Sequence, residues 1–194
     1  MALLEVEGLK FKYADQELYQ DVAFRILPKE HIVLVGDNGC GKSTFMNLIA
    51  SNLIPDQGSI RWLPSIRFGY LDQQLKVKTD VSIYDYLTEV FAPLFAKEKE
   101  MNAYYEKLTE CPEYEYEKYL NRAQQIQEEL EKANFYSFNS TLGNVINGLG
   151  IQNYGMDTHL NRLSGGQKAK VFLAKLLLDG PDVLLLDEPT NFLD

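Results

Sequence analysis

Apolar and polar residues follow regular patterns along the first part of the chain, and these patterns predict three strands and a helix. Residues 3–11 and 22–27 show short stretches of alternation, which is typical of half-buried strands. Residues 31–35 form a mostly apolar run that ends at a glycine, so we expect a buried central strand there. Residues 42–52 carry apolar side chains at helical spacing, and the turn sequence Pro-Asp-Gln-Gly follows them.

The middle of the chain predicts two short strands, 59–62 and 66–71, and then a pair of helices. Ser82-Ile-Tyr-Asp has the form of a capping box and places a helix start near residue 82. Cys111-Pro112 interrupts the helical pattern, and a second helix follows. Its apolar positions step by four and three, the spacing of an interhelical seam: Tyr119, Ala123, Ile126, Leu130 and Ala133. We therefore expect an antiparallel helical hairpin over 82–134, although two helices packed flat on the core would give the same pattern.

The last part of the chain predicts an α/β arrangement. Helices are expected near 141–149 and 166–178, and Val-Leu-Leu-Leu at 183–186 predicts a fully buried parallel strand. No apolar stretch approaches the roughly 20 residues of a membrane-spanning helix, and the first ten residues lack the pattern of a signal peptide. We expect a cytoplasmic protein.

Composition and charge exclude some functions. With 28 acidic and 19 basic residues the formal net charge is -9, which argues against a broad electrostatic grip on a phosphate backbone. Part of the acidic excess lies in residues 97–132 and is typical of a solvated helical face. The two cysteines, Cys40 and Cys111, lie far apart and predict neither a disulfide framework nor a structural metal site.

Residues 36–44 match the phosphate-loop pattern GxxxxGK[ST] between a predicted strand and a predicted helix. Glycines let backbone N–H groups turn inward around a phosphate, and the helix N-terminus adds a partial positive charge of about 0.5. We expect Lys42 to bridge the β- and γ-phosphates of a nucleotide and the Ser43 hydroxyl to bind Mg²⁺. The candidate nucleotide-binding residues of this loop are Gly36, Asn38, Gly39, Cys40, Gly41, Lys42, Ser43 and Thr44.

Two acidic residues follow the predicted strand 183–186. A nucleotide site built on a phosphate loop needs such acidic residues at the end of a second strand. Asp187 is a candidate for holding the metal ion through its water shell. Glu188 is placed to polarise the attacking water as a general base.

Leu-Ser-Gly-Gly-Gln at 163–167 opens a helix with a hydroxyl, two glycines and a helix N-terminus, so it is a second candidate anion receptor. The candidate residues are Ser164, Gly165, Gly166 and Gln167. With this motif between the phosphate loop and the Asp-Glu strand, the chain resembles the ATP-binding-cassette superfamily. The resemblance implies that Tyr13 stacks on adenine and that Gln73, or Gln74 with a register shift of one, contacts Mg²⁺ and water. It also makes residues 191–194 the D-loop.

Glu-Pro-Thr-Asn before Phe192-Leu-Asp resembles the F subfamily, whose members are soluble tandem cassettes that act on ribosomes as translation or antibiotic-resistance factors. The 90 positions from Gln73 to Leu163 suit the helical arm of that subfamily. Phe192 stands where the subfamily usually has His, and Lys170 stands where Arg is common. These departures bear on which branch of the superfamily the chain belongs to, and not on ATP binding.

The resemblance implies an N-terminal cassette over 1–194, with the arm subdomain at 82–134, that hydrolyses ATP to ADP and phosphate. The implied partners are a second, head-to-tail cassette and the ribosome. The alternatives are the ATPase subunit of a membrane transporter, whose partner is a permease, and a non-hydrolysing ATP clamp. The histidines His31 and His159 both precede the Asp-Glu strand, so the switch histidine of the family is not among them. The resemblance implies that the strand carrying this histidine lies between the phosphate-loop strand and the Asp-Glu strand. We therefore expect a gap in the sheet at that position and weak turnover by this chain alone.

Overall fold

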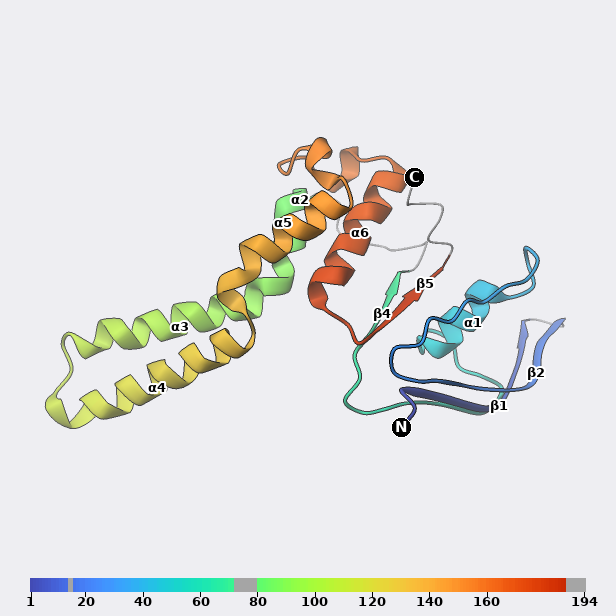
Figure 1. Cartoon of the computed structure of the whole chain (residues 1–194), viewed down its shortest axis with the longest axis horizontal. Helices are drawn as coiled ribbons and strands as arrows, with labels where there is room; N and C mark the ends of the chain where they lie inside the picture. The colour runs from blue at the N-terminus through green and yellow to red at the C-terminus, as the bar shows by residue number, and fades with distance from the viewer. Residues whose placement is uncertain (14–15, 72–79, 188–194) are drawn as a thin grey trace. The chain divides into compact units, whose positions relative to one another are not determined.

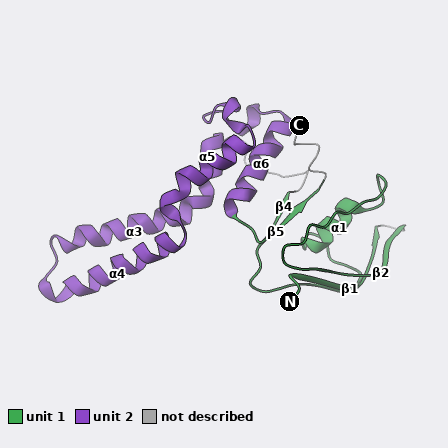
Figure 2. Cartoon of the chain, in the orientation of Figure 1, with its two compact units in different colours: residues 1–76, 180–191 green, residues 77–179, 192–194 purple. Residues whose placement is uncertain are grey.

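A computed structural model describes residues 1–13, 16–71 and 80–187 of the 194-residue chain (Figure 1). The α-helices, 3₁₀-helices (η) and strands have these bounds: β1 (Leu4–Tyr13), β2 (Gln16–Ile26), α1 (Lys42–Ile49), β3 (Gln57–Trp62), β4 (Phe68–Leu71), α2 (Ile83–Thr88), η1 (Glu89–Phe91), α3 (Ala92–Leu108), α4 (Glu113–Lys132), η2 (Phe135–Ser137), α5 (Phe138–Gly148), η3 (Ile151–Tyr154), η4 (Leu160–Arg162), α6 (Gly165–Asp179) and β5 (Val183–Leu186). They belong to two compact units: unit 1 comprises residues 1–76 and 180–191, and unit 2 comprises residues 77–179 and 192–194 (Figure 2).

Unit 1 contains an antiparallel sheet in the order β2-β1-β3 and a parallel pair, β4 and β5. Alternate residues of β1 point inward and pack with α1 and with Leu185 of β5. Trp62 ties the end of α1 to the sheet, because its indole N–H donates to the Ile49 carbonyl oxygen over 2.8 Å. The indole also stacks on Phe68, with ring centroids 4.6 Å apart. The core of this unit therefore lies between the sheets and α1.

The prediction of a buried strand at 31–35 was wrong. These residues belong to no strand among those that the structure describes, and Val33 and Val35 are 81% and 85% exposed. A strand of this type is stabilised by hydrogen-bonded neighbours, and β4 and β5 pair with each other instead. The prediction of a fully buried strand at 183–186 was also wrong in part, since Leu184 is 38% exposed while Leu185 is buried.

Unit 2 is helical, and its main core lies between α2, α5 and α6. Ser82 caps the helix as predicted: the Asp85 N–H donates to the Ser82 hydroxyl over 3.0 Å and α2 begins at the next residue, Ile83. The Asp85 carboxylate accepts from the Ser82 hydroxyl. Pro93 lies in the first turn of α3, where the missing N–H costs nothing, so it marks the start of a helix and not a bend. Within the described residues, no helix is both long and apolar enough to cross a membrane.

Helices α3 and α4 form an antiparallel hairpin, called the arm below, and contact mainly each other (Figure 1). Ala123, Ile126 and Leu130, all on the predicted seam, are at most 1% exposed and pack with Met101 and Phe135. The hairpin therefore forms, but over α3 and α4 only. Helix α2, which the prediction of a hairpin over 82–134 included, packs in the main core of unit 2 instead, and Ala133 of the predicted seam is exposed.

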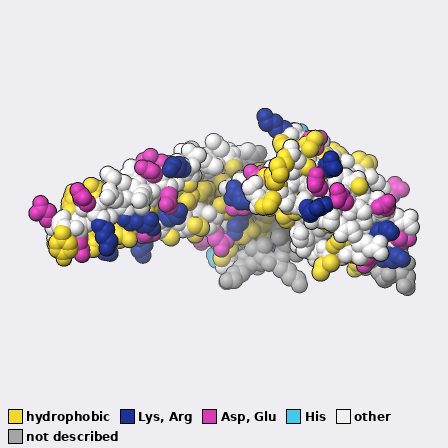
Figure 3. Space-filling model, turned by 90° about the horizontal axis from the view of Figure 1, so that it is seen from below, with side chains coloured by type: hydrophobic (Ala, Val, Ile, Leu, Met, Phe, Trp, Pro, Cys, Tyr) yellow, Lys and Arg dark blue, Asp and Glu magenta, His cyan; other side chains and the backbone are white. Residues whose placement is uncertain are grey.

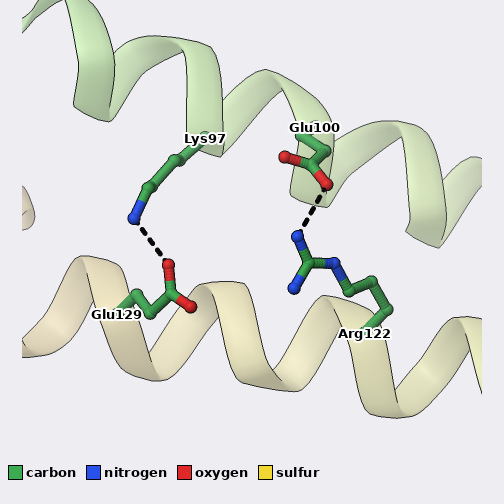
Figure 4. A network of polar contacts seen from close by, with 4 residues as sticks. All are labelled: Lys97, Glu100, Arg122 and Glu129. Carbon is green, nitrogen blue, oxygen red and sulfur yellow. Dashed lines mark hydrogen bonds and ion pairs between the residues drawn. The ribbon is translucent and has the colours of Figure 1, made fainter.

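Ion pairs border the apolar seam of the arm (Figure 4). Lys97 lies 2.6 Å from Glu129, and Arg122 lies 3.2 Å from Glu100, each pair joining α3 to α4. The Lys97 ammonium lowers the pKa of Glu129, so this carboxylate stays charged. Because all four side chains are partly exposed, the pairs contribute little to the stability of the arm.

Candidate functional site

The phosphate loop lies in unit 1 and ends where α1 begins. Gly41, the last residue before α1, has a φ of 104°, a backbone conformation that side-chain-bearing residues rarely adopt. The Lys42 side chain folds back over the loop: its ammonium donates to the carbonyl oxygens of Gly36 and Asp37 over 2.8 and 2.9 Å. The ammonium therefore lies at the loop whose N–H groups would face a phosphate.

The loop and the start of α1 are open to solvent. Asn38, Gly39, Cys40 and Ser43 are exposed, while Thr44 is partly buried. The N–H groups of the first turn of a helix have no acceptor within the helix. Open N–H donors, a helix N-terminus and an ammonium together fit a phosphate group chemically. The arrangement thus fits the triphosphate of a nucleotide.

Tyr19 of β2 contacts the end of the phosphate loop, a role that the sequence did not reveal. Its hydroxyl donates to the Gly41 carbonyl oxygen over 2.5 Å, and its ring meets the Phe45 ring edge-on at a centroid distance of 5.6 Å. Burial raises the pKa of the Tyr19 hydroxyl, so the proton that it donates is retained well above neutral pH. The pattern of polar residues around it gave no signal of this contact.

The Leu-Ser-Gly-Gly-Gln segment begins α6 in unit 2. Leu163 is buried in the main core of that unit, while Ser164, Gly165 and Gly166 are exposed. Ser164 and Gln167 form a reciprocal cap: the Gln167 N–H donates to the Ser164 hydroxyl over 3.3 Å. In return, the Ser164 N–H donates to the Gln167 side chain over 2.9 Å. Ser-x-x-Gln is the spacing of a capping box, so these residues also cap α6. The sequence alone could have revealed this second role.

The remaining candidates lie in unit 1 or outside the residues that the structure describes. Tyr13 ends β1 in unit 1 and is 65% exposed, so its ring face is accessible. Asp187 follows β5 in the same unit and is 6% exposed. Gln73, with its alternative Gln74, and Glu188 lie outside the residues that the structure describes.

A family model described as ABC transporter matches residues 19–191, which include the phosphate loop, the 163–167 segment and the Asp-Glu pair. The chain therefore belongs to the ABC transporter family. It is a nucleotide-binding domain of that family, as the motifs predicted, and it is an ATP-binding domain.

Proteins similar in sequence are named as ATP-binding proteins. The chain is 45% identical over 194 residues to the uncharacterized ABC transporter ATP-binding protein YfmM of Bacillus subtilis, covering 100% of this chain and 38% of that protein. It is 31% identical over 192 residues to the tylosin resistance ATP-binding protein TlrC of Streptomyces fradiae, covering 98% of this chain and 35% of that protein. The chain thus spans little more than a third of the length of these relatives.

A solved ATP-binding subunit of an ABC transporter has the same fold, with a TM-score of 0.66 and 21% identity. The match covers 99% of this chain and 68% of that structure. The predicted fold class is confirmed: an α/β ABC ATPase core with a small antiparallel sheet and a helical hairpin insertion. For this ABC domain the described residues contain no cluster of His, Cys, Asp and Glu that could hold a metal on its own.

Proposed function

We propose that this ABC domain hydrolyses Mg-ATP as a cassette of the F subfamily and acts on the ribosome. The observation that carries the proposal is the arm, an inserted helical hairpin with its own apolar core. The similarity to a protein named for tylosin resistance supports the same assignment. The subfamily resemblance of residues 188–194 is a third, independent support.

Nucleotide binding in this proposal rests on the phosphate loop. The N–H groups at the start of α1 and the Lys42 ammonium hold the phosphates, after the ammonium exchanges its contacts with the Gly36 and Asp37 carbonyl oxygens for phosphate oxygens. The Ser43 hydroxyl and the Asp187 carboxylate would hold the Mg²⁺ of Mg-ATP, which would neutralise phosphate charge. Tyr13 offers its exposed ring to the adenine.

Hydrolysis requires groups beyond those of the phosphate loop. Glu188 acts as the general base and Gln73 orients the attacking water. The Ser164 hydroxyl of a facing cassette donates to the nucleotide from the opposite side, and its oxygen can go on accepting from the Gln167 N–H while it does so. Turnover therefore depends on the encounter of two cassettes.

The arm is the element that contacts the ribosome in this proposal. Acidic and basic side chains are interspersed along it (Figure 3), and residues 97–132 contain ten Glu against five Lys and one Arg. Such a surface does not favour strong phosphate contacts. Near the turn between the helices, Tyr114 is 82% and Tyr116 46% exposed, and they offer aromatic contact area instead.

Co-sedimentation with ribosomes tests this function. The full chain carrying Glu188→Gln, which retains bound ATP in this account, should sediment with ribosomes, and replacement of residues 97–134 by a short turn should abolish this while ATP binding survives. Tyr114→Ala should weaken sedimentation, whereas Tyr84→Ala, which removes a 45% exposed tyrosine of α2, should not.

Three results would contradict the proposal. They are binding that is independent of the arm, an absence of ribosome binding, and recovery of the chain with a membrane permease. The last would instead favour the ATPase subunit of a transporter.

A further inference from the structure

We infer that Tyr19 is a positioning residue of the nucleotide site and that its hydroxyl fixes the peptide plane that presents the Lys42 N–H to phosphate. The inference rests on the proposed nucleotide site and adds to it a residue outside the motifs. It starts from one contact, the hydrogen bond from the Tyr19 hydroxyl to the Gly41 carbonyl oxygen.

The Gly41 carbonyl oxygen accepts two hydrogen bonds. One comes from the Phe45 N–H over 2.8 Å and is an ordinary bond of the first helical turn. The other comes from the Tyr19 hydroxyl over 2.5 Å, and Tyr19 belongs to a different element, β2. Together they define the direction of the Gly41 carbonyl group.

The direction of this carbonyl group also sets the direction of the Lys42 N–H. The Gly41 carbonyl and the Lys42 N–H belong to one trans peptide unit, in which the C=O and N–H bonds point in opposite directions. The Lys42 N–H is in the first turn of α1, whose N–H groups have no intrahelical acceptor. The contact that holds the carbonyl on the side of β2 therefore aims this N–H away from β2 and toward the open side of the loop.

The geometry around Gly41 indicates that this contact is closely fitted. A Cβ atom built on Gly41 would lie 2.6 Å from the Tyr19 hydroxyl oxygen and 3.3 Å from the ring carbon that bears it. The tyrosine is itself held in place, because its ring packs edge-on against Phe45 and its backbone is paired with Phe11 of β1. Gly41 is thus required both by its φ of 104° and by the space that Tyr19 fills.

The contact also links the two parts of the proposed nucleotide site. Tyr19 lies in β2, and the β1 partner of β2 ends at Tyr13, the candidate adenine-stacking residue. The β1–β2 hairpin thereby connects the base-binding and phosphate-binding ends of the site. The contact of the Tyr19 hydroxyl with Gly41 lies at the phosphate-binding end only.

Tyr19→Phe is the decisive variant, because it keeps the ring and its packing on Phe45 and removes the hydroxyl alone. A hydrogen bond contributes about 0.5–1.5 kcal/mol net, so we expect the dissociation constants for ATP and ADP to rise by about 2- to 12-fold. Adenosine binding, followed by NMR titration, should not change, because adenosine has no phosphate. In the absence of nucleotide, the Lys42 amide resonance should shift, since its peptide plane loses one of its two fixed contacts.

Tyr105→Phe is the matched control. It removes a part-buried tyrosine hydroxyl that donates to the Gln127 side chain in the arm, over 3.1 Å. Each variant loses one hydrogen bond of a part-buried tyrosine, so the two melting temperatures should fall by similar, small amounts. ATP affinity should fall only in Tyr19→Phe.

Several results would overturn the inference. These are unchanged ATP affinity in Tyr19→Phe, an equal loss for adenosine, or an affinity loss accompanied by a lower melting temperature than that of Tyr105→Phe. A parent chain that binds no ATP would instead refute the proposed function. The nucleotide-free Lys42 resonance would still report in that case whether the hydroxyl holds the peptide plane.

Discussion

The apolar seam of the arm allows its stability to be changed separately from that of the rest of unit 2. Ile126 of α4 is 1% exposed and packs with Met101 and Leu130 inside the hairpin. Ile126→Ala removes its three outer carbon atoms. Truncations of this kind cost about 2–5 kcal/mol. A two-helix seam can relax around a cavity, and alanine favours helix slightly more than isoleucine, so we expect about 2–3 kcal/mol.

Amide hydrogen exchange measures this loss directly. At about 1.4 kcal/mol for each factor of ten, the amides around Ala123 and Leu130 should exchange about 30- to 150-fold faster in Ile126→Ala. The amides of α6, in the main core of unit 2, should keep their rates. Tyr114→Ala is the control, because Tyr114 lies in the same helix and is 82% exposed. Equal acceleration in α6, or none in α4, would refute an arm that opens independently.

Three further predictions concern catalysis, pH and association. Glu188→Gln should keep ATP affinity and slow hydrolysis by about 10²- to 10⁴-fold in a hydrolysis-competent pair of cassettes; equal single-turnover rates would refute its role as the base. Burial, with the Glu89 charge adding to it, raises the pKa of Tyr86 from 10.0 to about 12. The folded chain thus retains a proton that the unfolded chain loses above pH 10, and up to about 2 kcal/mol of stability should be lost between pH 10 and 12. Denaturant titrations should find that loss smaller in Tyr86→Phe, and an identical pH dependence would count against the assignment. Because residues 32–35 are apolar and exposed, the chain should associate with rising concentration, and Val33→Lys should reduce this association in sedimentation velocity. An unchanged sedimentation profile in the variant would be evidence against association through this segment.

The features that the sequence predicted well are those set by local rules. The helix cap at Ser82 depends on residues three positions apart, and the phosphate-loop motif places the start of α1 at Lys42. The seam around Ala123 and Ile126 follows from helical spacing alone. In each case the residues that decide the structure are close neighbours in the chain.

The features that the sequence missed depend on distant partners. Residues 31–35 have the composition of a strand, but a strand forms only where another strand offers hydrogen bonds, and composition cannot supply that partner. Strand β2 extends over Gln16–Ile26 and not only 22–27, because pairing with β1 stabilises its polar half. Tyr19 contacts Gly41 across 22 positions of sequence, and no local pattern predicts such a contact.

Calorimetric titration of the parent chain and of Lys42→Ala with Mg-ATP tests the central claim, that the loop before α1 binds the nucleotide phosphates. Two charge-assisted hydrogen bonds to phosphate contribute about 1.5–3 kcal/mol each, so the substitution should weaken binding by about 10²- to 10⁴-fold. The melting temperature without nucleotide should change little, because the present acceptors of Lys42, the carbonyl oxygens of Gly36 and Asp37, belong to exposed residues and become hydrated. Saturable binding by the parent and its loss in Lys42→Ala is the predicted result. Equal affinity in both chains, or no binding by the parent, would contradict the account.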